Sequence, residues 1–115
     1  MAHTLARAPL NKTAPTPPPA PAAVAAERSA QWRRQADEYD AFAASLSDYT
    51  LKAAYRDLAK DLRARADRVA IEPVTAARDI ARADTIRRTA ADCTDPALRR
   101  EMNAAAAAIE RGEAR

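Results

Sequence analysis

The sequence predicts an all-α protein in which two antiparallel helical hairpins fold together as a small bundle, behind a disordered N-terminal tail. Alanine, the best helix former, supplies 33 of the 115 residues. Gly112 is the only glycine and β-branched residues are few, so strands and tight hairpin turns are disfavoured. Apolar residues take up helical spacing from about residue 24 onward. We therefore expect a tail over residues 1–22 and one helical domain over residues 23–115.

The tail is rich in proline, with five prolines between Pro15 and Pro21. Such a segment buries too little apolar surface to offset the entropy cost of ordering, and its prolines favour an extended polyproline conformation. It acts either as a solvated spacer or as a peptide that docks in the aromatic groove of a partner. In the second case the contact residues would be Pro17, Pro18 and Pro19.

Two apolar seams define the first hairpin. The first seam advances by four and three residues in turn through Trp32, Ala36, Tyr39, Ala43 and Leu46. The second seam has the same rhythm through Leu51, Tyr55, Leu58, Leu62, Ala66 and Val69. The two seams do not share a phase, so the chain must reverse between them, and Ser47 and Asp48 are favourable N-cap residues for the second helix. We expect antiparallel helices over residues 24–46 and 49–71.

Prolines mark where the second hairpin begins and where it turns. Pro73 ends the preceding helix and suits the first position of the next one. Thr94, Asp95 and Pro96 supply a cap residue followed by proline at the first helical position, which is a strong start signal. We expect helices over residues 73–93 and 96–111, and the simplest arrangement of the two hairpins is a four-helix bundle.

The segment from Arg87 to Arg111 carries a resemblance. Its centre reads Ala90-Ala91-Asp92-Cys93-Thr94-Asp95-Pro96-Ala97-Leu98-Arg99-Arg100. This stretch resembles short alanine- and arginine-rich bacterial helical-hairpin proteins, whose second helix opens with an Asp-Pro-x-x-Arg turn. The resemblance covers about a quarter of the chain. It implies a hairpin fold and no assigned activity.

Large apolar side chains are scarce. All residue types larger than alanine in the hydrophobic class supply only 22 residues, three of them in the tail. The last helix offers only Leu98, Met102 and Ile109, beside the alanine run Ala104–Ala108. Alanine allows close packing but removes little area from water. We therefore expect an isolated monomer to be marginally stable, with its core completed by a partner or by a second copy.

The distribution of charge argues against a simple polyanion binder, although the pI is about 9.4. Two of the 19 cations, Arg7 and Lys12, lie in the tail, which leaves 17 lysines and arginines against 16 carboxylates in the rest of the chain. Because the signs are interleaved, the surface produces a weak field at a distance. Neither long-range attraction to DNA nor attachment to a membrane by charge alone is expected.

Nucleic acid binding is nevertheless the alternative function. A basic stripe runs along the second helix through Lys52, Arg56, Lys60 and Arg63. Asp57 and Asp61 lie among these cations and would oppose phosphate groups. We therefore expect nucleic acid to be a less favoured partner than protein.

No group of residues in the sequence is suited to catalysis or metal binding. The single histidine, His3, lies in the tail and the single cysteine, Cys93, in the body, so a zinc site cannot be assembled from nitrogen and sulfur ligands. With one glycine, the chain lacks a glycine-rich phosphate loop. We expect no enzyme activity, cofactor or metal. Cys93 lies on the apolar seam of the third helix, which favours a small buried residue over a redox-active or intermolecular thiol.

Several features indicate a cytoplasmic protein. A single cysteine cannot form an intramolecular disulfide and fits a reducing compartment. No apolar run approaches the roughly 18–20 residues that cross a bilayer. Prolines interrupt the first 26 residues, which disfavours a secretory signal. The same segment, acid-free with arginine and threonine, also resembles an organelle transit peptide, but its prolines disfavour the amphipathic helix that such peptides form.

Aromatic residues are concentrated in the first hairpin. Most of them should belong to the core, but Phe42 lies one position off the seam, where it either widens the apolar face or stands exposed as an anchor for another protein. The expected function is a non-catalytic interaction module, an accessory or adaptor subunit that docks on a larger partner or self-associates through this hairpin. The candidate contact residues are Trp32, Tyr39, Phe42, Tyr49 and Tyr55, together with the tail prolines named above.

Overall fold

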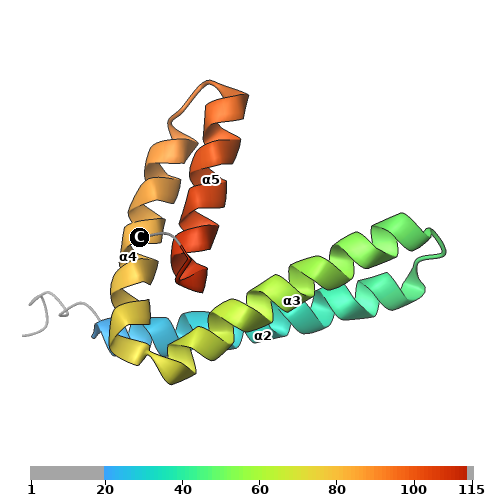
Figure 1. Cartoon of the computed structure of the whole chain (residues 1–115), viewed down its shortest axis with the longest axis horizontal. Coiled ribbons are helices and arrows are strands. Elements are labelled where there is room, and N and C mark those ends of the chain that lie inside the picture. Colours follow the sequence, from blue (N-terminus) through green and yellow to red (C-terminus); the bar gives the residue numbers. More distant parts are fainter. Residues whose placement is uncertain (1–19, 114–115) are drawn as a thin grey trace, which may run out of the picture.

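The computed structural model describes residues 20–113 and places four α-helices in them, with no strand in that range. The helices are α2 (Pro21–Ser45), α3 (Tyr49–Ile71), α4 (Pro73–Ala91) and α5 (Pro96–Arg111). The predicted all-α fold of two helical hairpins is confirmed, and most helix ends lie within two residues of their expected positions (Figure 1). The helices are determined locally, by alanine content, apolar spacing and proline placement.

The first helix begins earlier than expected, because Pro21 occupies its first turn. Proline has no backbone N–H to leave unpaired there, and its φ is already helical. Ala20 precedes it in an extended conformation, with φ −60° and ψ 144°. Residues 21 and 22, which we assigned to the tail, are therefore helical.

Both hairpin turns use an aspartate cap. The Asp48 carboxylate accepts a hydrogen bond from the backbone N–H of Leu51 at 3.1 Å, and the Asp95 carboxylate accepts one from Ala97 at 3.0 Å. Each bond satisfies one of the free N–H groups at the start of a helix. The predicted starts of α3 and α5 are thereby confirmed.

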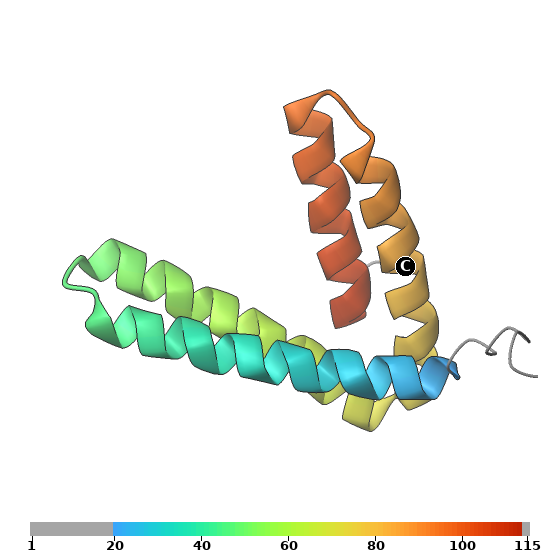
Figure 2. The same ribbon diagram turned by 180° about the vertical axis from the view of Figure 1, so that it is seen from behind.

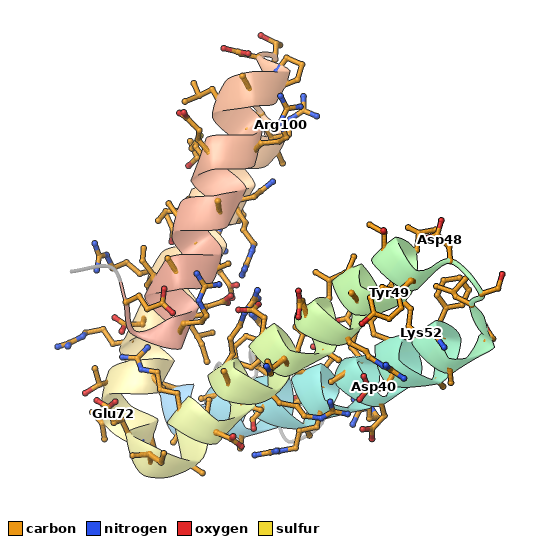
Figure 3. The ribbon with its side chains drawn as sticks, turned by 45° about the vertical axis from the view of Figure 1, so that its right-hand side comes forward. Asp40, Asp48, Tyr49, Lys52, Glu72 and Arg100 are labelled. Carbon is orange, nitrogen blue, oxygen red and sulfur yellow. The ribbon has the colours of Figure 1, made fainter. Side chains whose placement is uncertain are left out.

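The two hairpins join at one end and diverge. Figures 1 and 2 show α2 and α3 side by side, α4 and α5 side by side, and the second hairpin rising from the end of the first where α3 gives way to α4. Figure 3 shows Glu72 at this corner, Tyr49 at the tip of the first hairpin and Arg100 near the tip of the second. The hairpins therefore do not pack side by side along their whole length, as they would in a compact four-helix bundle.

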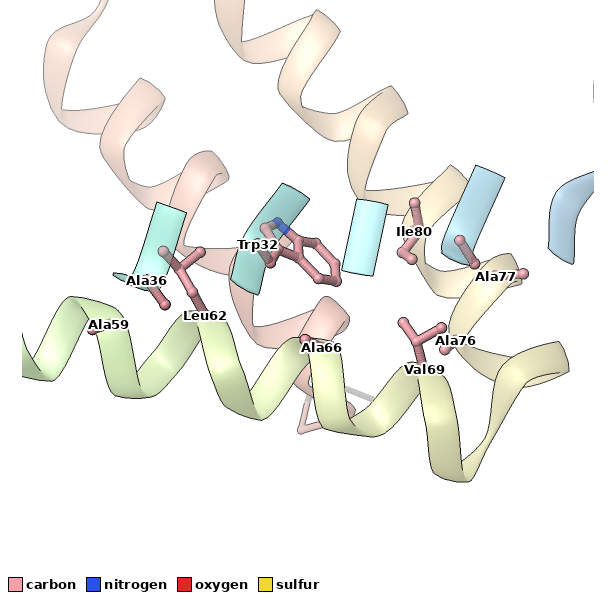
Figure 4. Packing of buried hydrophobic residues seen from close by; sticks show 10 residues of the cluster. Trp32, Ala36, Ala59, Leu62, Ala66, Val69, Ala76, Ala77 and Ile80 are labelled. Atoms are coloured by element: carbon pink, nitrogen blue, oxygen red, sulfur yellow. The ribbon is translucent and has the colours of Figure 1, made fainter. Parts of the chain in front are cut away.

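The core is built mainly of alanine. Of the 15 buried apolar residues among those described, ten are alanines, and the larger ones are Trp32, Leu62, Val69, Ile80 and Ile109. The main cluster lies where α2 and α3 meet the beginning of α4 (Figure 4). Small side chains let the helix axes approach closely, so each hairpin is thin and has no large apolar interior.

Cys93 is not the buried residue that we expected. Helix α4 ends at Ala91, and Cys93 lies in the following turn with an intermediate exposure. Its Sγ is 3.8 Å from the carbonyl oxygen of Asp95, and its own carbonyl accepts hydrogen bonds from Arg99. The apolar seam of α4 ends one turn earlier, at the buried Ala90.

Candidate interaction surface

A buried carboxylate lies at the junction of the two hairpins. The side chain of Glu110, on α5, has no exposed surface. Arg87 donates two hydrogen bonds to it, at 2.7 and 2.5 Å, and Arg65 donates one at 3.2 Å. A nitrogen of Arg28 lies 3.9 Å away. Glu110 thus gathers arginines from α2, α3 and α4, which compensate the charge of its buried carboxylate.

A second pair connects the hairpins beside this site. Arg28 of α2 donates two parallel hydrogen bonds, both 2.9 Å, to the carboxylate of Asp84 on α4. These bonds lower the pKa of Asp84 below its ordinary value, against the opposing effect of its partial burial. They also raise the pKa of Arg28, so the pair stays charged.

A buried arginine holds the end of α5. Arg68 of α3 donates to the carbonyl oxygens of Ile109 at 3.0 Å and Glu110 at 3.3 Å, and to the carboxylate of Asp79 at 2.6 Å. The carbonyls at a helix C-terminus have no partners within the helix, so the guanidinium acts as their cap. Gly112 follows with φ +81°, and a Cβ there would meet Arg68 Nε at 2.7 Å. Only glycine leaves room for this contact.

The charged junction covers only the half of the first hairpin that lies next to the corner between α3 and α4, which we call the proximal half; the half that ends at the tip is the distal half. Its members on α2 and α3 are Arg28, Asp61, Arg65 and Arg68. Arg65 also bonds Asp61 and lies over the ring of Trp32, with its guanidinium carbon 5.9 Å from the ring centroid. Beyond these residues, toward the tip, neither α4 nor α5 covers the first hairpin (Figure 1).

The distal half of the same side is apolar. On α3 the positions that contact the second hairpin continue toward the tip at intervals of three and four residues, through Leu58, Ala54 and Leu51. On α2, Phe42 lies two heptads beyond Arg28 on the same stripe. We name Phe42, Leu51, Ala54, Tyr55 and Leu58 the open face. In a closed bundle this is the face that the second hairpin would cover.

Exposure confirms that the open face has no cover within residues 20–113. Phe42, Leu51 and Leu58 keep 48%, 48% and 47% of their surface exposed. Tyr55 lies between them and is partly buried, because the ring of Phe42 meets it edge-on with centroids 4.8 Å apart and Tyr39 lies 5.7 Å away. These contacts lie within the first hairpin, so the face is formed by the chain itself.

The candidate contact residues from the sequence divide into three groups. Trp32 is in the core, 6% exposed, and offers no surface to a partner. Phe42 and Tyr55 belong to the open face, and Tyr39 packs against Tyr55 from below it. Phe42, which lies one position off the α2 seam, widens the face. Tyr49 is 84% exposed at the first turn of α3, but it lines a shallow groove with Lys52 and Arg56 on another side of the helix. The remaining candidates, Pro17, Pro18 and Pro19, lie outside the described residues.

Sequence reasoning missed the exposure of Leu51 and Leu58. Both lie on the α3 seam, and an apolar seam by itself predicts burial for its members. A seam residue is buried only if a second surface covers it, and at this end of the hairpin α2 alone is too narrow to do so. One signal in the sequence was available. Large seam residues are more frequent at the distal end of α3, with Leu51, Tyr55 and Leu58, than at the proximal end, where the seam includes Ala66.

The carboxylates Glu38 and Asp57 border the open face on its two sides. Both are exposed, and neither has an ion-pair partner within residues 20–113. The nearby acids Asp37 and Asp40 differ, because both bind Arg63 on the opposite side of the hairpin, at 2.9 and 2.6 Å. Arg34 lines the same hollow as Glu38, and Asp57 lines the same groove as Lys52 and Arg56, so charges of both signs lie beside the face.

An apolar groove of about 490 Å³ lies at the outer corner, away from the open face. The ends of α2 and α4 form it through Pro21, Pro73, Val74 and Ala77, with Arg78 at its edge. Val74 and the neighbouring Ile71 are 82% and 78% exposed. The groove holds no aromatic side chain, so Ile71 and Val74 provide a matched control for the aromatic open face.

The described residues contain no cluster of three or more histidine, cysteine, aspartate or glutamate side chains that could hold a metal ion. Within the same residues, no helix is both long enough and apolar enough to cross a bilayer. Comparison of the chain with family models, curated proteins and solved structures finds no match in any of the three.

Proposed function

We propose that this chain is a non-catalytic interaction protein of the cytoplasm, an accessory or adaptor subunit that binds another protein through the open face. An uncharged apolar surface at the end of a helical hairpin supports this proposal. Its members are half exposed although they lie on the stripe that is covered further along the same helices. A partner that covers the face would bury Phe42, Leu51 and Leu58 together, as the second hairpin covers the proximal half.

The different roles of the ion pairs at the junction and the apolar residues of the open face also support the proposal. The carboxylates at the junction, Glu110, Asp84 and Asp79, are engaged with arginines, so the ion pairs there serve to hold the hairpins in place. Interfaces of this kind derive most of their binding free energy from a few large apolar side chains near the centre of the contact. Phe42 and Leu58 are the residues of the open face that fit that role.

The test compares three forms of the full chain as affinity baits in lysate from the source organism. One is the native chain, one carries Leu51→Lys and Leu58→Lys, and one carries Ile71→Lys and Val74→Lys at the outer corner. We expect the native chain and the corner variant to retain the same proteins, and the open-face variant to lose them. Because the replaced residues are half exposed or more, all three should show equal helicity by circular dichroism. Equal retention by all three baits would contradict the proposal.

Nucleic acid binding remains the second candidate function. Lys52, Arg56 and Lys60 repeat every four residues along α3, and within residues 20–113 none of them pairs with a carboxylate. Asp57 interrupts the stripe and weakens its attraction to phosphate. A gel-shift series with double- and single-stranded probes tests this function. Binding that persists at physiological salt and is lost in a Lys52→Glu and Arg56→Glu variant would favour it over the protein partner.

A further inference from the structure

The apolar groove at the outer corner begins where the described chain begins. Pro21 of α2 lines it on one side, and α4 lines it on the other through Pro73, Val74, Ala77 and Ala81, with Arg78 at its edge. Eight residue steps separate Pro73 from Ala81, so the groove follows α4 for about 12 Å. Val74 stays exposed within residues 20–113. The groove is thus apolar and elongated, and it starts at the residue where the preceding chain enters α2.

The segment that enters there is uncharged and stiff. Residues 13–20 read Thr-Ala-Pro-Thr-Pro-Pro-Pro-Ala and contain no charged side chain. Consecutive prolines at 17, 18 and 19 fix φ at about −65°, and a residue that precedes a proline is confined to extended or polyproline conformations. Ala20 has φ −60° and ψ 144°, which are polyproline dihedrals. Four residues in this conformation span about 12 Å, which matches the length of the groove along α4.

We propose that residues 16–19 of this chain occupy the outer-corner groove, with their proline rings against Val74 and Ala77. The segment turns onto α4 at Pro19, whose ψ is less restricted because the next residue is Ala20 and not a proline. Docked in this way, it ties the start of α2 to the start of α4 and supports the corner where the two hairpins join. Residues 16–19 lie outside the described residues, and the groove together with the sequence that leads into it carries the proposal.

The direct covalent connection favours this segment over a separate molecule. A free peptide loses translational and rotational freedom when it binds, whereas a segment joined to the rim of the groove has an effective concentration on the order of millimolar. Its prolines have already restricted the backbone, so less entropy is lost on docking. The lack of charge in residues 13–20 also matters, because an apolar groove would desolvate a charged side chain. This site is separate from the open face, so it adds to the proposed function without depending on it.

The experiment is nuclear magnetic resonance of the isotope-labelled full chain. We expect nuclear Overhauser contacts between the ring protons of Pro17–Pro19 and the methyl groups of Val74 and Ala77, which arise only between protons in close contact. The order parameter of the Thr16 amide should approach the value of about 0.85 that is typical of rigid backbone. In a Val74→Asp variant the contacts should disappear, and the order parameter of Thr16 should fall below about 0.6, because a carboxylate in the groove opposes apolar contact.

Two further variants of the full chain separate docking from folding. Leu98→Asp introduces the same charge at a half-exposed leucine near the tip of the second hairpin, and it should leave Thr16 and the contacts unchanged. The triple substitution Pro17→Ser, Pro18→Ser and Pro19→Ser removes the rings and should lower the order parameter of Thr16 as Val74→Asp does. The triple variant alters no helical residue, so it keeps the test decisive even if Val74→Asp unfolds. Circular dichroism checks that helicity is equal.

Three results would overturn the proposal. The first is an order parameter below about 0.6 at Thr16 in the native chain, without contacts between proline rings and methyl groups. The second is contacts that pass only between labelled and unlabelled copies in a mixed sample, because the occupant would then be the same segment of a second copy. The third is a Thr16 order parameter that stays high in both the Val74→Asp and the triple serine variants. Each of these results leaves the proposed function standing, since the open face is tested separately through Leu51 and Leu58.

Discussion

The proximal and distal halves of the first hairpin are made of the same two helices and differ in what lies above them. In the proximal half, charged side chains of α2 and α3 meet charged side chains of α4 and α5, with Glu110 at the centre. In the distal half the same stripes carry Phe42, Leu51 and Leu58, and α4 and α5 have turned away. The distal half is thus the part of the first hairpin whose large apolar side chains stay uncovered.

This difference shows how a chain with little bulk fixes its tertiary arrangement. Alanine seams hold each hairpin together, and the larger side chains of one apolar cluster, Trp32, Leu62, Val69 and Ile80, pack where α2 and α3 meet α4. Ion pairs with defined geometry join this cluster in fixing how one hairpin sits on the other. Buried pairs contribute less to net stability than to the choice of one arrangement, because desolvation offsets much of their attraction.

The largest effect should come from Glu110→Ala, which leaves Arg65 and Arg87 without their shared carboxylate in a buried site. Removing one partner of a buried ion pair typically costs about 3–5 kcal/mol. We expect the midpoint of urea unfolding to fall accordingly. Glu101→Ala on the exposed side of the same helix is the matched control and should change stability by less than about 0.5 kcal/mol. A small, equal effect of both substitutions would show that the junction is not a determinant of the fold.

A pair of leucines on α3 compares the two halves directly. Leu62 is 7% exposed in the proximal half and Leu58 is 47% exposed in the distal half. Leu62→Ala should lower the free energy of unfolding by about 2–4 kcal/mol, because it leaves a cavity. Leu58→Ala should cost less than about 1 kcal/mol, because much of its side chain is already in water. Equal losses, measured by urea titration, would mean that the distal face is covered in solution.

Gly112→Ala tests the contact that caps α5. Alanine at φ +81° is strained, and its Cβ would collide with the Arg68 guanidinium. We expect a loss of about 1–2 kcal/mol in thermal or urea unfolding. Gly112→Asn accepts the left-handed conformation more readily but still collides with Arg68. If asparagine restores full stability, the backbone conformation matters and the contact with Arg68 does not.

The smallest expected effect is the pH dependence of stability that the pair of Arg28 and Asp84 contributes. The pKa of Asp84 in the folded state is lowered by Arg28, so the pair stabilises the fold above the ordinary aspartate pKa of about 3.9 and loses this contribution as the pH falls below it. At neutral pH the free energy of unfolding of the native chain should exceed that of an Asp84→Asn variant by about 1 kcal/mol or less. The difference should shrink as the pH falls below the ordinary aspartate range, because the carboxylate then becomes protonated. Unfolding curves at pH 7, 5 and 3 measure it, and a difference that grows on acidification would contradict the assignment.

The sequence predicts the helices well and their arrangement poorly, for a physical reason. Pro73, Asp95-Pro96 and the three–four spacing of apolar residues act within one or two turns, so they locate helix ends from local information. The junction depends on residues far apart in the chain, such as Arg28 with Asp84 and Arg65 with Glu110. On a helical wheel each of these charges is indistinguishable from a solvated one. Only their position beside seam residues, as with Glu110 next to Ile109, hints at burial.

The candidate site was predictable in part for the same reason. The concentration of aromatics pointed to the first hairpin as a whole, and the offset of Phe42 from the seam left two possibilities, a wider apolar face or an exposed anchor. The exposure of Leu51 and Leu58 follows from the divergence of the hairpins, which no local pattern encodes. Trp32 has the strongest composition signal for a docking residue, yet it belongs to the apolar core cluster with Leu62 and Ile80.

The distance between the two hairpin tips tests most directly whether the second hairpin leaves the distal face uncovered. Cys93 at the tip of the second hairpin is the only cysteine, and Ser47→Cys supplies a second labelling position at the tip of the first. Arms of about 37 and 28 Å, from helices of 25 and 19 residues that diverge from one end, should give a spin–spin distance of several tens of ångströms by pulsed electron resonance. A main population near about 10–15 Å, the spacing of neighbouring helices in a closed bundle, would contradict the open arrangement and the docking surface derived from it.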